Sequence, residues 1–166
     1  MIELTRLTVA QIRTAAEAAA SDVLAQHWAG GKLPVDPVKV ARRLGVEVYS
    51  AQLGNDVWGF IKGDVAATVI YVDDDQPPNR YRFTVAHELG HYVAHGPGAT
   101  FVDRRSDADR GRPDEVFANH YAGALLMPAD TLELLHASGL GVLRMADRFG
   151  VSYDALKYRL HLVGLS

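Results

Sequence analysis

Two helices are predicted at the start of the chain from its pattern of hydrophobic and polar residues. Residues 8–28 are rich in alanine and free of proline and glycine, which predicts a long helix that ends at the following Gly-Gly pair. Asp36 followed by Pro37 is typical of a helix N-cap and first turn, and predicts a short second helix that stops at Gly45.

Three segments rich in β-branched and aromatic residues come next. They are VEVYSA (46 to 51), VWGFIK (57 to 62) and AATVIYV (66 to 72). Short stretches of turn-forming residues separate them, so a small three-stranded antiparallel sheet is expected.

The rest of the chain is predicted to be mainly helical. We expect a helix capped by an Asp and two prolines and running to about His95, a polar loop over 97–112, and a helix closed by Pro128. A short helix to about 136 and two helices separated by Gly150 would follow. The predicted fold class is therefore α+β: one mostly helical domain over 1–166, with a helix-turn-helix-like subregion at about 139–166.

Composition narrows the chemistry that this chain can perform. Its net charge of -3 gives no general attraction to nucleic acid or to anionic membranes. Without cysteine, disulfides, zinc ribbons and thiol catalysis are excluded, so metal chemistry would rest on histidines and carboxylates. No signal peptide and no apolar run approaching ~18 residues is found. We expect a cytoplasmic protein.

The segment AHELGHYVAHG, residues 86–96, holds three of the seven histidines. His87 and His91 are at positions i and i+4 of the predicted helix, so both imidazoles can reach one cation. Glu88 flanks the same face and is suited to act as a general base on water. The alternative is an ordinary helix that contains this five-residue pattern by coincidence.

A catalytic zinc site of this kind needs a third protein ligand. His95 continues the series, but eight helical residues place its Cα ~12 Å from that of His87, too far to converge. We therefore interpret His95 as a helix-end residue. Glu115 is the better candidate because its predicted helix carries small residues on the same face. Alternatively, Glu115 only complements the helix dipole.

Several longer motifs in this chain resemble those of the ImmA/IrrE zinc metallopeptidases. The matching stretches are RFTVAHELGH at 82–91, E-x-x-A-N at 115–119, YAGALLMP at 121–128 and FGVSYDALKYRL at 149–160. The resemblance implies a thermolysin-like arrangement in which His87, His91 and Glu115 bind Zn²⁺ and Glu88 is catalytic. Tyr121 and Ala124 depart from the family's usual Phe and Glu, which affects finer contacts more than the metal.

The resemblance also implies a function. Members of the family are mostly bacterial or phage regulators that cleave or inactivate a helix-turn-helix repressor. We therefore predict a zinc-dependent endopeptidase that acts on such a protein in a stress or phage switch. Asn119, one turn after Glu115, is predicted to orient a ligand. Five residues are considered as a helper for the oxyanion, without a choice among them: Tyr81, Tyr92, His95, His120 and Tyr121.

Two other classes of function stay open at this point. The tail LRMADRFGVSYDALKYRL has helix-turn-helix spacing, and Lys157 and Arg159 would lie on its second helix. Nearby Asp147 and Asp154 offset that charge, so the sequence argues against direct nucleic-acid binding. The chain could also bind and inactivate a partner without cutting it. For a peptidase, an exposed edge at 57–62 or 66–72 would let an extended substrate add to the sheet.

Overall fold

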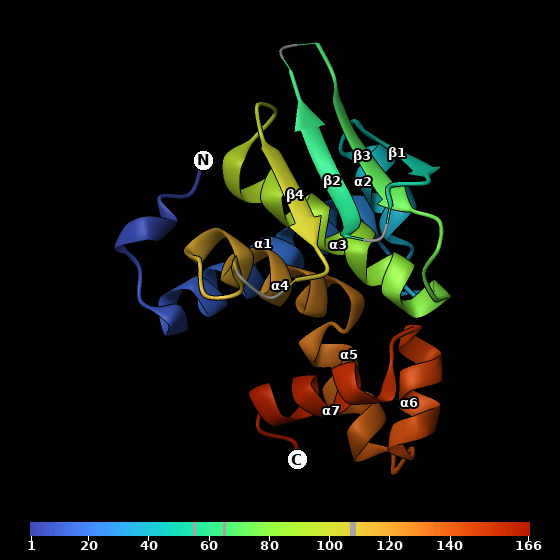
Figure 1. Ribbon diagram of the computed structural model, residues 1–166. Helices are drawn as coiled ribbons and strands as arrows, with labels where there is room; N and C mark the ends of the chain where they lie inside the picture. The colour runs from blue at the N-terminus through green and yellow to red at the C-terminus, as the bar shows by residue number, and fades with distance from the viewer. Residues whose placement is uncertain (55, 65, 107–108) are drawn as a thin grey trace.

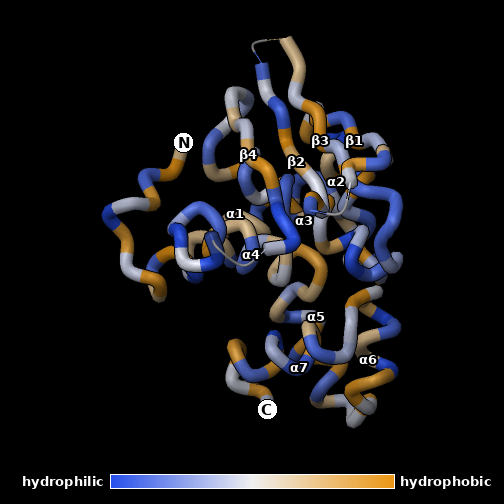
Figure 2. Tube along the Cα trace, in the orientation of Figure 1, coloured by the Kyte–Doolittle hydropathy of each residue, from blue (hydrophilic) through white to orange (hydrophobic). Residues whose placement is uncertain are grey.

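A four-stranded sheet covers one side of the mostly helical structure (Figure 1). The computed structural model describes residues 1–54, 56–64, 66–106 and 109–166. Within them the strands are β1 (Val46–Ala51), β2 (Val57–Gly63), β3 (Thr68–Asp73) and β4 (Thr100–Arg104), in the order β1-β3-β2-β4. Figure 2 shows hydrophobic stretches in β2, β3 and β4.

The sheet differs from the predicted three antiparallel strands in number and direction. β1 pairs in parallel with β3, because the chain passes from β1 to the far side of β3 before the β2–β3 hairpin brings it back. β4 pairs antiparallel with β2 and comes from the segment predicted to be a loop. Residues 107 and 108 of that segment lie outside the described residues. The prediction missed β4 because it is only five residues long and its hydrophobic and polar residues do not alternate.

The helix α3 (Pro78–His95), whose middle part is buried, packs under the sheet. Every residue from Thr84 to His91 is buried, since β2 and β3 cover one side of α3 and other helices cover the remainder. Its first turn has Pro77 and Pro78 without a side-chain cap, so the expected Asp cap is wrong. This central position removes His87, Glu88 and His91 from bulk solvent.

Two further helices complete the layer behind α3. The helices α4 (Pro113–Leu126) and α1 (Val9–His27) pack on each other, and α4 also packs along α3. Thr8 and Gln11 form a capping box at the start of α1. Asp36 is the N-cap of the short helix α2 (Pro37–Arg43), as predicted. Its carboxylate accepts hydrogen bonds from two backbone N–H groups. None of the helices in the described ranges is long and apolar enough to cross a membrane.

Three short helices form the C-terminal end of the molecule, shown in brown to red in Figure 1. They are α5 (Ala129–Ala137), α6 (Val142–Phe149) and α7 (Tyr153–Leu162). Gly150, in the left-handed conformation, separates α6 from α7, as predicted. Arg82 of α3 donates hydrogen bonds to the carbonyls of Gly150, Phe149 and Val35, which ties this turn to the body of the protein.

The second helix of the tail is also attached through a buried arginine. Arg159 is only 2% exposed, and its guanidinium binds the Glu17 carboxylate of α1 and the Met127 carbonyl. It is therefore unable to contact a nucleic-acid phosphate, as the helix-turn-helix interpretation would have required. Lys157 lies over the ring of Tyr153, 5.4 Å from its centroid.

Candidate metal centre

The side chains of His87, His91 and Glu115 converge between α3 and α4. The two histidine Nε2 atoms are 3.2 Å apart. Glu115 places one carboxylate oxygen 3.4 Å from Nε2 of His87 and the other 3.3 Å from Nε2 of His91. The three residues that the sequence analysis proposed as ligands therefore lie together.

These separations fit a small tetrahedral cation. Zinc binds histidine nitrogens and carboxylate oxygens at about 2.0–2.2 Å, and tetrahedral geometry then separates neighbouring ligand atoms by about 3.3–3.5 Å. The observed 3.2–3.4 Å matches that spacing. His87, His91 and Glu115 can thus hold a metal ion and leave a fourth position open.

Asn119 fixes the orientation of one of the ligands. Its Oδ1 atom lies 3.0 Å from Nδ1 of His87. Because a side-chain carbonyl only accepts hydrogen bonds, Nδ1 must carry the proton. In the neutral ring this leaves the lone pair on Nε2, which is the atom that faces His91 and Glu115. Asn119 therefore lies where the sequence analysis expected a ligand-orienting residue.

A close crossing of the two helices brings Glu115 to the histidines. At Gly90 of α3, an added Cβ would lie only 2.9 Å from the Cα of Ala118 on α4. Tyr121 also contacts this point, at 3.2 Å, and is fully buried. Tyr121 therefore packs against the histidine helix, and the small side chain of Ala118 allows the close approach.

Glu88 is buried beside the three candidate ligands and makes no hydrogen bond to any residue that the structure describes. Both carboxylate oxygens lack a partner among the described residues, although the residue is 0% exposed. Burial raises the pKa of Glu88 to about 8, since the low dielectric disfavours its charge. A buried carboxyl group with free lone pairs costs stability, which is characteristic of a group kept for chemistry or for a nearby cation.

The pKa values of His87 and Glu115 depend on each other's charge. Burial alone would lower the pKa of His87, but the carboxylates of Glu115 and Glu88 outweigh it and raise the value to about 9. Burial would raise the pKa of Glu115, but hydrogen bonds from His87 and His91 hold it below its usual range. Burial lowers the pKa of His91, so it is the proton bound by His87 that neutralises the carboxylate where a cation would otherwise do so.

His95 lies outside the ligand cluster, as predicted from helix geometry. Its ring stacks on Phe101 of β4, with centroids 4.8 Å apart. The same Phe101 ring stacks on His91 at 4.2 Å. Phe101 therefore covers one side of His91 and separates the cluster from the end of α3.

Asp103 of β4 is a neighbour of the site that the sequence analysis missed. Its carboxylate lies within 4.8 Å of ligand atoms of both His87 and Glu88. Burial raises the pKa of Asp103, and the charges of His87 and Arg80 counteract this. No clear signal for this is present in the sequence, because the residues of TFVDR do not alternate in polarity; once β4 forms, Phe101 and Asp103 lie on one face of the strand.

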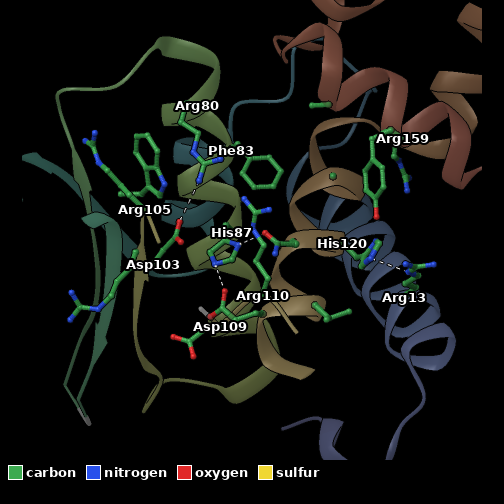
Figure 3. Close-up of a pocket in the computed structure, with 18 of the residues that line it drawn as sticks. Arg13, Arg80, Phe83, His87, Asp103, Arg105, Asp109, Arg110, His120 and Arg159 are labelled. Carbon is green, nitrogen blue, oxygen red and sulfur yellow. Dashed lines mark hydrogen bonds and ion pairs between the residues drawn. The ribbon is translucent and has the colours of Figure 1, made fainter. Parts of the chain in front are cut away.

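A cleft of about 540 Å³ opens at the metal centre. His87, Glu115 and Asn119 line it, together with residues of β4, α1 and α7. Figure 3 shows His87 between Asp103 of β4 and Arg13 of α1. Of the five residues considered as an oxyanion helper, His120 is the one that lines this cleft in the described part of the chain. Its Nε2 accepts a hydrogen bond from Arg13.

Comparisons with known proteins agree with this geometry. Residues 41–161 match a peptidase family described as the IrrE N-terminal-like domain. Two similar proteins are the radiation response metalloproteases IrrE of Deinococcus radiodurans, 31% identical over 70% of this chain, and of Deinococcus deserti, 32% identical over 55% of it. The aligned parts cover only 37% and 35% of those proteins.

A solved structure supports the fold. A Mycobacterium tuberculosis transcriptional regulator superposes with a TM-score of 0.57 over 90% of this chain and 46% of its own, at 18% identity. At that identity the likeness concerns the arrangement of helices and strands alone.

Proposed function

This chain belongs to the IrrE N-terminal-like family of the ImmA/IrrE metallopeptidases, and from this premise we propose that it is a zinc-dependent endopeptidase. One observation carries the proposal: the nitrogen and oxygen atoms of His87, His91 and Glu115 approach one another to 3.2–3.4 Å beside a buried carboxyl group that has no partner among the described residues. Membership of a metalloprotease family implies a metal ion and a protein substrate. Zinc is proposed because two imidazoles and one carboxylate are its usual ligands in hydrolases.

Each residue of the site has a distinct role in this proposal. When bound, a zinc ion supplies Lewis acidity, which lowers the pKa of water from about 15.7 to about 7 and polarises the carbonyl group under attack. His87, His91 and Glu115 hold the ion, and Asn119 keeps His87 in the tautomer that binds it. Glu88 accepts the proton of the attacking water and returns it to the departing amine.

An extended substrate can bind along β4. The expected edges at 57–62 and 66–72 are wrong, since β2 and β3 both lie inside the sheet. β4 is the edge strand beside the cleft, and in the described part of the chain it pairs only with β2. A substrate segment would pair with the free side of β4 through backbone hydrogen bonds, with its scissile bond above His87.

The substrate is proposed to be a helix-turn-helix repressor in the cytoplasm, on the strength of the family resemblance and the lack of cysteine. Co-expression with candidate repressors tests this. We expect discrete fragments with the wild type and none with Glu88→Gln. Complex formation without fragments would instead favour a binder that inactivates its partner, and fragments that persist with Glu88→Gln would contradict the role of Glu88.

A further inference from the structure

The cleft above the metal centre is lined by more arginines than carboxylates, although the chain as a whole carries a charge of -3. Among the described residues that line it, three are acidic: Asp103, Asp109 and Glu115. Six are arginines: Arg13, Arg80, Arg104, Arg105, Arg110 and Arg159. An arginine whose charge is only weakly compensated by a carboxylate can attract an anionic ligand.

Several of these arginines already serve a structural carboxylate. Arg105 binds Asp73 at 2.6 Å, and Arg159 binds Glu17 through two nitrogens. Arg104 lies 3.9 Å from Asp56, and both side chains are more than half exposed. The pairs of Arg105 and Arg159 hold the walls of the cleft, so these two arginines contribute less to ligand recognition than an arginine with a weaker partner.

Arg80 is held in place by aromatic rings and has weak compensation for its charge. Its guanidinium lies 4.5 Å from the ring centroid of Trp58 and 5.7 Å from that of Phe83. Its ion pair with Asp103 is long, 3.9 Å, and its buried Nε has no partner among the described residues. Burial, together with the charges of Arg105 and Arg110, lowers its pKa.

The head group of Arg80 is nevertheless accessible from the cleft. Its side chain is 40% exposed. Figure 3 shows Arg80 and His87 on either side of the Asp103 carboxylate, which places the guanidinium close to the reacting centre. A planar guanidinium has five N–H donors, so Asp103 leaves several of them for a second carboxylate.

We propose that Arg80 is a specificity-determining residue that binds an acidic side chain of the protein substrate. This inference rests on the proposed function, because it assigns a substrate preference to the same cleft. The preorganised guanidinium accepts a carboxylate with little loss of side-chain freedom, since Trp58 and Phe83 already restrict it.

The direction of β4 determines which side of the scissile bond carries the acidic residue. Along β4, Phe101 contacts His91 and His95, and Asp103 lies beside His87 and Arg80. β4 therefore runs opposite to α3, and a substrate antiparallel to β4 passes Arg80 before His87.

The length of α3 gives the position along the substrate. Arg80 and His87 are seven helical residues apart, about 10.5 Å along the axis. An extended strand rises about 3.3 Å per residue, so the acidic residue would lie about two or three positions before the cleaved bond.

A peptide fits this arrangement better than a nucleic acid does. A phosphate chain needs a continuous row of accessible cations, whereas Asp103, Asp109 and Glu115 interrupt the cleft and Arg159 is buried. A single carboxylate needs only one oriented guanidinium.

Mixture-based libraries of acetylated, amidated decapeptides test the inference. One position at a time is fixed as Glu, Gln or Lys. Cleavage by the zinc-loaded wild type is followed by mass spectrometry, and binding to zinc-loaded Glu88→Gln is measured by affinity selection. We expect Glu two or three positions before the cut to be preferred over Gln by about tenfold or more.

Variants at Arg80 identify the residue responsible. Arg80→Gln should abolish the preference, chiefly through KM, and Arg80→Glu should shift it to Lys. A gain of Lys preference cannot arise from misfolding. Arg148→Gln, the same charge change on the exposed face of α6, is the control and should retain the Glu preference.

The outcomes separate this inference from the proposed function. Cleavage without a preference for acidic residues, or a preference that survives Arg80→Gln, overturns the role of Arg80 and leaves the peptidase intact. Selection of Glu peptides without any cleavage contradicts the peptidase and supports the acidic subsite. If the library shows no cleavage and no selection of Glu peptides, both the peptidase and the acidic subsite are contradicted. A single-stranded oligonucleotide that displaces the Glu peptides at lower concentration would instead assign the charge to nucleic acid.

Discussion

At the scale of single residues, the site depends on which side chains carry protons and which carry free lone pairs. The Nδ1–H group of His87 donates a hydrogen bond to Asn119 Oδ1, so the Nε2 atom of His87 faces His91 and Glu115. Both carboxylate oxygens of Glu88 have no partner among the described residues. These states follow from hydrogen-bond geometry, and each can be tested by a substitution that alters one function of the site.

Substitution of Glu88 should affect catalysis alone, whereas substitution of a metal ligand should affect both metal binding and catalysis. Glu88→Gln should retain about one metal ion per chain and lose about 10²–10⁴-fold in peptide hydrolysis, because only the general base is removed. Glu115→Ala and His91→Ala should lose both, since two remaining ligands hold the ion poorly. Elemental analysis after gel filtration, with a hydrolysis assay, checks this. A Glu88→Gln protein without metal would place Glu88 among the ligands.

Asn119→Ala should weaken metal affinity by about 10–100-fold, because His87 loses the partner that selects its tautomer. Competition with a chromophoric chelator measures the change. Asn79→Ala, at an exposed position in the first turn of α3, should have wild-type affinity. Equal affinities in the two variants would show that Asn119 only fills space.

The metal-free protein should lose stability as the pH rises from about 6.5 to 9. His87 has a folded pKa of about 9, so its stabilising contribution is complete below 6.5 and is lost as the pH passes 9. Glu88, with a folded pKa of about 8, holds a proton that the unfolded chain has released, which also favours folding at lower pH.

Urea unfolding with a chelator present measures this effect. His87 and Glu88 can each lower the free energy of unfolding by at most about 1.4 kcal/mol per pH unit. Glu88→Gln should show a shallower decline because one of the two groups is removed. Stability that rises over this interval would contradict the assigned shifts.

At the scale of elements, the metal centre is a product of one tight helix crossing. Gly90 lets α3 and α4 approach so closely that a methyl group would meet the Cα of Ala118 at 2.9 Å. The sheet acts in a second way, because Phe101 and Asp103 of β4 reach over the end of the site. The helix crossing and the position of β4 both depend on where the backbone lies, which cannot be inferred from side-chain chemistry alone.

Gly90→Ala should destabilise the protein by about 1–3 kcal/mol and reduce its metal affinity, because the added methyl group forces the helices apart and withdraws Glu115. Gly123→Ala on α4 is the matched control. It has no atom within 4 Å of the added Cβ, and alanine should stabilise that helix by up to about 1 kcal/mol. Urea denaturation and metal titration measure both, and equal effects would contradict the tight crossing.

At the scale of the whole molecule, the C-terminal helices are attached to the body by two arginines. Arg82 reaches from α3 to the turn between α6 and α7, and Arg159 reaches from α7 to α1. In the helix pair that resembles a DNA-binding motif, the buried Arg159 thus binds Glu17 of α1 and attaches α7 to the rest of the protein. This placement supports a structural role for α7 as a wall of the cleft.

Arg82→Ala should cost about 2–4 kcal/mol, because carbonyls on both sides of the interface lose a charged donor. Hydrogen exchange should increase mainly in α6 and α7, while metal content stays near that of the wild type. Arg148→Ala, at an exposed position of α6, should leave exchange unchanged. Uniform acceleration across α3 and the sheet would show that Arg82 supports the whole core instead.

The sequence by itself determined most elements and indicated the three candidate ligands that the structure brings together. Helical phase pairs His87 with His91 and excludes His95, and the small residues after Glu115 indicate that a second helix can approach the first. These are local properties, fixed by the period of the helix and by side-chain size.

Only the tertiary structure decided what depends on contacts between distant segments. The pairing of β4 with β2 converts a predicted loop into the edge strand beside the cleft, and strand partners are not encoded by local periodicity. Folding also brings Asp103 and Arg80 to the metal centre and buries Arg159 against Glu17, 142 residues away. The excess of arginines over carboxylates among the residues that line the cleft is therefore set by the fold, because the chain as a whole carries a charge of -3.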